Sequence, residues 1–172
     1  VRPDGMRQHY GYDAKLQSNN KYALTHIALQ QDETSPIIKT SQWQYDAQNR
    51  AISYENLEDD TKNIKIEYVK TPTTTETGLT IVSNHLNQNT SFISSIKAGK
   101  YVLEQISGSG CYGCSAVASK AKYDEHARLT YINDTQIDRY NNGLPKTISP
   151  STNNWDDLKL SYNESGLLQS WQ

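Results

Sequence analysis

A turn led by tyrosine recurs along this chain in imperfect copies. Each copy has Tyr, then Asp or Asn, then a few mostly polar residues, then an aliphatic or small residue. The copies begin at Tyr45, Tyr123 and Tyr162, with a shorter copy at Tyr140 and a degraded one at Tyr12. A repeated unit that cannot bury its own apolar face must stack on its neighbours. The repetition therefore favours a shell, wall or filament over an enzyme.

Each copy has the chemistry of a β-hairpin. The Tyr ends a strand, covers a sheet face with its ring and keeps its hydroxyl near water. Asp46 or Asn163 opens the turn, because a short polar side chain accepts bonds from backbone N–H groups two residues on. Three residues later, Asn49 or Gly166 is predicted to have positive φ. The second copy has Ala127 there, so its turn is either strained or of another type.

The Tyr140 copy is one residue shorter and contains Asn-Gly, which is the strongest short hairpin signal. Turns are therefore predicted at 46–49, 141–143 and 163–166. The predicted repeat-turn residues are Tyr45, Asp46, Asn49, Tyr123, Asp124, Tyr140, Asn141, Gly143, Tyr162, Asn163 and Gly166.

The flanking segments read as strands. Residues 64–69 and 158–163 alternate between apolar and polar side chains, as strands with one buried face do. Short β-branched runs occur at 80–82 and 130–132. The best helical candidate, 115–121, is rich in small residues and too short. We expect an all-β fold, an antiparallel sheet of successive hairpins.

Composition limits the kind of core and the partners. Only 35% of residues are hydrophobic, with twelve Tyr and one Phe, so we expect Tyr stacking, cross-strand pairs and a thin apolar layer. Polar strands suit a sheet with one wet face. The net charge of −2 gives no reason to expect nucleic acid or an anionic membrane as partner. No apolar stretch approaches the roughly 18 residues of a membrane span.

We expect residues 1–172 to form one segment of a repeat array, with both ends cut from a longer array. No compositional step divides the chain, and the Thr-rich residues 71–78 read as an edge loop or strand. The expected parts are a weak repeat at 1–34, hairpins at 37–70, strands at 79–106, a cysteine turn at 107–114 and repeats at 120–172.

Cys111 and Cys114 are the one group of residues whose side chains could bind a metal or carry out redox chemistry. As a zinc half-site, the pair lacks a second Cys/His pair nearby. As a redox pair, it lacks a helix N-terminus and a βαβ context. We therefore expect a structural pair, either a small disulfide loop or two buried thiols. No catalytic, cofactor-binding or metal-binding residue is predicted.

Other candidate residues have plainer interpretations. The four histidines, at positions 9, 26, 85 and 126, show no metal spacing. The acidic pairs at 59–60 and 156–157 are expected in solvated turns, because adjacent strand residues point to opposite faces. Trp43, Trp155 and Trp171 are expected to cap the sheet or pack between repeats, with a carbohydrate platform as the alternative.

The repeated Tyr-Asp-x-x-(Gly/Asn)-Arg-(Leu/Ala) pattern resembles the YD repeats of Rhs proteins, which include polymorphic bacterial toxins and the animal teneurins. Residues 107–114 resemble a Ser-Gly-x-Gly-Cys-x-x-Cys element found between repeat blocks of many Rhs proteins. Residues 1–5 with 10–13 look like the usual lead-in to a repeat. Copies here are few and widely spaced, and no Asp-Pro-x-Gly segment occurs.

The resemblance implies a segment of a β-sheet ribbon that spirals into a hollow shell. Such a shell encloses or presents a toxin or effector domain, which would lie outside this chain. The implied partners are the rest of the repeat array, a C-terminal effector domain and a secretion-system or surface partner. The implied location is secreted or at a bacterial cell surface. The alternative is a cell-surface β module that binds carbohydrate or protein. An enzyme is not expected.

Overall fold

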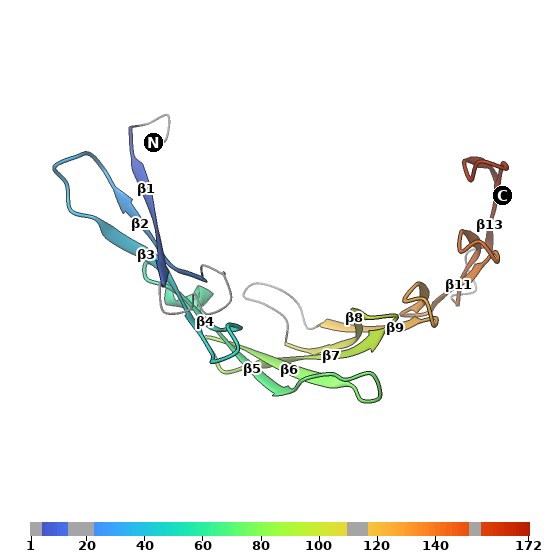
Figure 1. Ribbon diagram of the computed structural model, residues 1–172, viewed down its shortest axis with the longest axis horizontal. Helices are drawn as coiled ribbons and strands as arrows, with labels where there is room; N and C mark the ends of the chain where they lie inside the picture. Colours follow the sequence, from blue (N-terminus) through green and yellow to red (C-terminus); the bar gives the residue numbers. More distant parts are fainter. Residues whose placement is uncertain (1–4, 14–22, 110–116, 152–155) are drawn as a thin grey trace. The chain divides into compact units, whose positions relative to one another are not determined.

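The protein is an all-β chain, as predicted. The computed structural model describes residues 5–13, 23–109, 117–151 and 156–172 (Figure 1). Fourteen antiparallel strands follow one another in a single open sheet, in the same order as in the sequence. Each strand from β2 to β13 therefore pairs with the strand before it and the strand after it, and the outer strands β1 and β14 pair with one neighbour each, which is the pattern of consecutive hairpins.

The strands vary from four to nine residues in length. They are β1 (Arg7–Asp13), β2 (Ala23–Gln30), β3 (Ile38–Tyr45), β4 (Ala51–Asn56), β5 (Ile64–Lys70), β6 (Gly78–Asn84), β7 (Asn89–Lys97), β8 (Lys100–Gly108), β9 (Val117–Tyr123), β10 (Leu129–Ile132), β11 (Thr135–Arg139), β12 (Pro145–Pro150), β13 (Leu158–Tyr162) and β14 (Leu168–Trp171).

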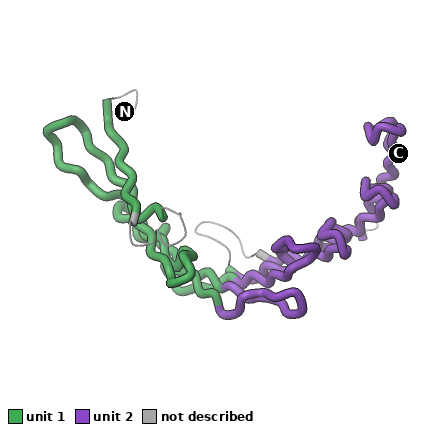
Figure 2. Tube along the Cα trace, viewed as in Figure 1, with its two compact units in different colours: residues 1–68, 81–90, 109–115 green, residues 69–80, 91–108, 116–172 purple. Residues whose placement is uncertain are grey.

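The chain divides into two compact units (Figure 2). Unit 1 comprises residues 1–68, 81–90 and 109–115, and unit 2 comprises 69–80, 91–108 and 116–172. In unit 2, β9 to β14 form three consecutive hairpins (Figure 1). Because the strands alternate in direction, the turns that close these three hairpins lie at the same ends of their strands. We call this row of turns the turn edge of unit 2.

Local sequence explains the strands. In β5, half-buried Ile64, Ile66 and Tyr68 alternate with exposed Lys65 and Glu67, as the period-2 pattern predicted. The Thr-rich residues 71–77 form the loop between β5 and β6. The segment 117–121, part of the weak helical candidate, lies in β9.

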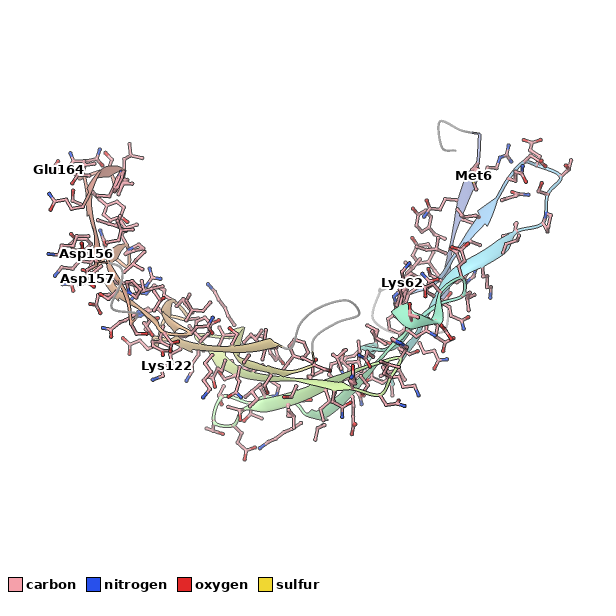
Figure 3. All side chains as sticks on the ribbon, turned by 180° about the vertical axis from the view of Figure 1, so that it is seen from behind. Met6, Lys62, Lys122, Asp156, Asp157 and Glu164 are labelled. Carbon is pink, nitrogen blue, oxygen red and sulfur yellow. The ribbon has the colours of Figure 1, made fainter. Side chains whose placement is uncertain are left out.

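The sheet has almost no interior. Among the described residues, only Ala28, Gly78, Thr90 and Ser95 are buried. Figure 3 shows side chains projecting from both sides of the ribbon. Cross-strand pairs take the place of a core: the rings of Trp43 and Tyr54 lie 5.2 Å apart.

Helix is confined to a single turn in the part of the chain that the structure describes. This is the 3-10 helix η2 (Asp60–Lys62), which Asp59 caps by accepting a bond from the Thr61 backbone N–H at 3.2 Å. No described helix has the length and apolar character that crossing a bilayer requires.

Candidate functional site

The turn between β3 and β4 shows what the repeated motif does. The backbone N–H of Asn49 donates to the carbonyl oxygen of Asp46 at 3.0 Å, and Asn49 has φ 61°. Asp46 Oδ1 accepts from the backbone N–H groups of Gln48 and Arg50, both at 2.9 Å. The Arg50 guanidinium then pairs with Asp46 Oδ2 at 2.7 Å. One carboxylate thus holds both the backbone of the turn and the arginine that follows it.

The turn between β9 and β10 repeats these bonds. Asp124 Oδ1 accepts from the backbone N–H groups of His126 and Arg128 at 2.9 Å, and Arg128 Nε donates to Asp124 Oδ2 at 2.7 Å. Ala127 occupies the fourth position with φ 59°. The turn is therefore of the same type as the Asp46 turn, and of the two alternatives the strained one is correct. A Cβ in this region costs about 1–2 kcal/mol.

The Tyr140 turn differs from the prediction. Tyr140 itself takes the position of Asp46: its N–H donates to the Leu144 carbonyl at 2.9 Å, and Gly143 N–H donates to the Tyr140 carbonyl at 2.8 Å. The turn is therefore not one residue shorter. Gly143 has φ 91°, whereas Asn142 is not in the left-handed region. A short Asn-Gly turn needs positive φ at both residues, so this hairpin uses the longer loop with its glycine in the bulge.

The last turn follows the predicted pattern. Gly166 N–H donates to the Asn163 carbonyl at 2.9 Å, and Leu167 N–H donates to Asn163 Oδ1 at 2.8 Å. Gly166 has φ 78°, as predicted. An Asn side chain therefore replaces the Asp of the earlier turns, without an arginine to pair with it.

The tyrosine hydroxyls were expected to lie near water, and in the structure three of the predicted residues also have a backbone carbonyl as acceptor. Tyr45 donates to the carbonyl of Leu24 at 2.8 Å, and Tyr123 donates to the carbonyl of Leu103 at 3.1 Å. In both cases the acceptor lies on the preceding strand. Tyr140 instead reaches forward to β13, to the carbonyl of Leu160 at 3.0 Å. In each case the long phenol reaches from a turn or strand end to a carbonyl group within another strand.

The turns of unit 2 stack on one another along their shared edge. The Arg128 guanidinium lies against Gly143, where a Cβ would overlap it. A Cβ on Gly166 would meet Leu144 Cδ1 at 3.7 Å. The rings of Tyr140 and Tyr162 meet edge to face, with centroids 6.2 Å apart. Each hairpin tip is thus packed against the next one.

This stacking leaves an open recess of about 560 Å³ at the Tyr140 turn. Its lining includes Arg139, Lys146, Asn142 and the two stacked tyrosines. The recess is a surface feature built from turn residues and from the strand residues beside them, and only its repeated Tyr and Asn positions could be picked out from the sequence.

No protein-family model and no curated protein matches this sequence. The resemblance to Rhs proteins therefore stays a prediction.

Hydrogen bonding to the turn carboxylates changes their acidity. Partial desolvation raises the pKa of Asp46 and of Asp124, but the bonds and charge supplied by Arg50 and Arg128 outweigh it, so the pKa of each falls below its usual value. Asp32, in the loop between β2 and β3, accepts bonds from Thr34 and Ser35 that lower its pKa to about 2.

One further copy of the turn was missed. Asn84 Oδ1 accepts from the backbone N–H groups of Leu86 and Gln88, and Asn87 has φ 58°. This turn joins β6 to β7 and matches the Asp46 turn bond for bond in its backbone. The sequence signal for this turn was the pair Asn84 and Asn87, three residues apart. It was overlooked because no Tyr precedes it; the preceding residue is Ser83.

The remaining candidates are scattered. Cys111, Cys114 and Trp155 lie outside the described residues, so the structural role of the cysteine pair stays a prediction. Trp43 packs on Tyr54 in unit 1, whereas Trp171 is exposed at the end of β14. The described residues contain no group of three or more His, Cys, Asp or Glu side chains placed to hold a metal ion.

Proposed function

We propose that this chain is a non-catalytic segment of a YD-repeat shell of the Rhs type, which encloses or presents an effector domain outside these 172 residues. The proposal rests first on the repeated turn. Asp46 and Asp124 make the same backbone and arginine bonds at positions 78 residues apart (124 − 46). A motif repeated in such detail fits an array of similar units, each of which packs against its neighbours.

The distribution of polar and apolar side chains also supports a wall. In the described part of the chain, Ala28 is the only buried hydrophobic residue, and both faces of the sheet carry side chains (Figure 3). Stability comes instead from turn bonds, tyrosine hydroxyls and cross-strand pairs, each of which involves neighbouring strands only. Such a sheet can be lengthened hairpin by hairpin without a change of core.

The test is protease protection in the natural full-length protein. Asp124→Ala removes the carboxylate that holds the β9–β10 turn, and Glu125→Ala changes the exposed neighbouring residue in the same turn. We expect the effector domain to resist digestion in the unmodified protein and to be digested faster in Asp124→Ala, with Glu125→Ala unchanged.

Two results would contradict the proposal. One is an adjoining domain that is digested as fast within the full-length protein as when expressed alone. The other is a full-length protein that contains no domain besides the repeats.

A further inference from the structure

The recess at the Tyr140 turn carries an unbalanced positive charge. Arg139 and Lys146 both line it, and none of the described residues that line it is acidic. Among the described residues, no carboxylate lies in ion-pair range of either cation. The nearest acids in sequence are Asp138, directly before Arg139 on β11, and Asp156, Asp157 and Glu164, which flank β13. All four are exposed, and none is among the residues that line the recess (Figure 3).

The walls of the recess are held in place by bonds that do not involve a ligand. Arg139 donates from Nε and Nη2 to the Leu129 carbonyl, at 3.2 and 2.8 Å, and from Nη1 to the Gly143 carbonyl at 2.9 Å. Tyr140 is anchored through its hydroxyl to Leu160. Preorganised groups of this kind lower the entropic cost of binding.

These bonds also decide which anion fits. The Nε and Nη2 edge of Arg139 is occupied by a carbonyl, so this arginine cannot offer that edge to a phosphate as a bidentate fork. Lys146 remains as an exposed point charge, with its Nζ 5.9 Å from the centre of the Tyr140 ring. A single carboxylate suits such a cation.

The other lining groups suit a sugar. Asn142 uses its Oδ1 to accept from the Leu144 N–H at 3.1 Å, which leaves its amide Nδ2 hydrogens to donate. Asn141 offers a second exposed amide, and Tyr140 and Tyr162 supply aromatic surface. Together, the amides can bind the hydroxyl groups of an acidic sugar, the aromatic rings its C–H face and the cation its carboxylate. The volume of about 560 Å³ is in the range of small-ligand sites.

We propose that this recess binds an acidic oligosaccharide, with a uronate carboxylate on Lys146 and sugar hydroxyls on the asparagine amides. The site would sit on the turn edge of unit 2 and does not depend on the proposed shell function.

The experiment titrates the whole chain with trigalacturonate and, separately, with its methyl ester, by isothermal calorimetry. Lys146→Gln removes the proposed carboxylate partner, and Lys146→Arg retains the charge. Lys159→Gln is the matched control: Lys159 is an exposed lysine on the neighbouring strand β13, where it pairs with Thr147, and it is not among the residues that line the recess. Circular dichroism checks that each variant keeps the sheet.

We expect trigalacturonate to bind and the ester to bind about tenfold more weakly or worse, since a charge-assisted bond is lost. Lys146→Gln should weaken binding by about the same factor, Lys146→Arg should restore most of it, and Lys159→Gln should stay within about twofold. Equal binding of the ester, or no binding at millimolar concentration, would overturn the proposal. Inorganic phosphate or polyglutamate binding as tightly as trigalacturonate would overturn the sugar assignment.

Discussion

The guanidinium of Arg128 occupies the space that a side chain at Gly143 would need. Arg128 belongs to the β9–β10 turn, where Asp124 holds it, and Gly143 belongs to the next turn along the same edge. The contact therefore joins two consecutive hairpins, through Arg128 of the first and Gly143 of the second. It places the two turns in direct contact through a side chain.

Gly143→Ala should cost more than Gly166→Ala. Both glycines have positive φ, 91° and 78°, so each substitution carries the left-handed strain of about 1–2 kcal/mol. At Gly166 the new Cβ meets only Leu144 at an ordinary 3.7 Å, whereas at Gly143 it displaces Arg128. In an Arg128→Ala background, urea unfolding should show that the two glycine substitutions lower the free energy of unfolding by similar amounts. Equal costs in the unmodified background would contradict the contact.

Ala127→Gly should stabilise the protein by about 0.5–1 kcal/mol. The substitution relieves the strain of a Cβ at φ 59°, and part of this gain is offset by the greater freedom of glycine in the unfolded chain. Ala47→Gly is the control, because Ala47 lies in the matching Asp46 turn without positive φ, and it should lower stability. Denaturant midpoints measure both. A loss of stability in Ala127→Gly would show that the turn is not strained.

Tyr45→Phe and Tyr123→Phe should each lower the free energy of unfolding by about 0.5–1.5 kcal/mol. Each change removes a hydroxyl that donates to a carbonyl of the preceding strand, at 2.8 and 3.1 Å, and keeps the ring. Tyr101→Phe, at a side chain that is 68% exposed, should have almost no effect. If all three variants melt alike, the hydroxyl bonds do not contribute.

Acid should destabilise the fold as the turn carboxylates protonate. The folded-state pKa values of Asp32, Asp46 and Asp124 are lowered, so their contribution is complete above the usual value of 3.8 and is lost as pH falls through the folded-state pKa. For Asp32 this window runs from 3.8 down to about 2.

The measurement is urea unfolding at a series of pH values between 5 and 2. Asp124→Asn should be less stable at pH 5 and should lose less on acidification, whereas Glu125→Gln should follow the unmodified protein. A parallel decline in both variants would assign the acid sensitivity to other groups.

Much of the fold could be predicted from residues a few positions apart. The Tyr-Asp copies placed the turns at Asp46 and Asp124, and the alternation in residues 64–69 identified β5. Asn49 and Gly166 were assigned positive φ correctly. These features are local: a carboxylate or amide bonds backbone groups within four residues, and strand periodicity follows from the pleat. The Asn84 turn has the same local basis, but Ser83 precedes it where the other predicted copies have Tyr, so the Tyr-Asp pattern does not predict it.

The all-β class and the chemistry of the turns follow from bonds within one hairpin, so both are encoded in residues a few positions apart. Folding of the whole sheet sets where each tyrosine hydroxyl donates, that Tyr140 opens its own turn, and that Arg128 lies against Gly143. It also brings Lys146 and Arg139 to one recess. Apart from the bonds within the Tyr140 turn, these contacts join residues of different strands or turns, and their partners are set by strand register and turn stacking, which no short sequence motif encodes.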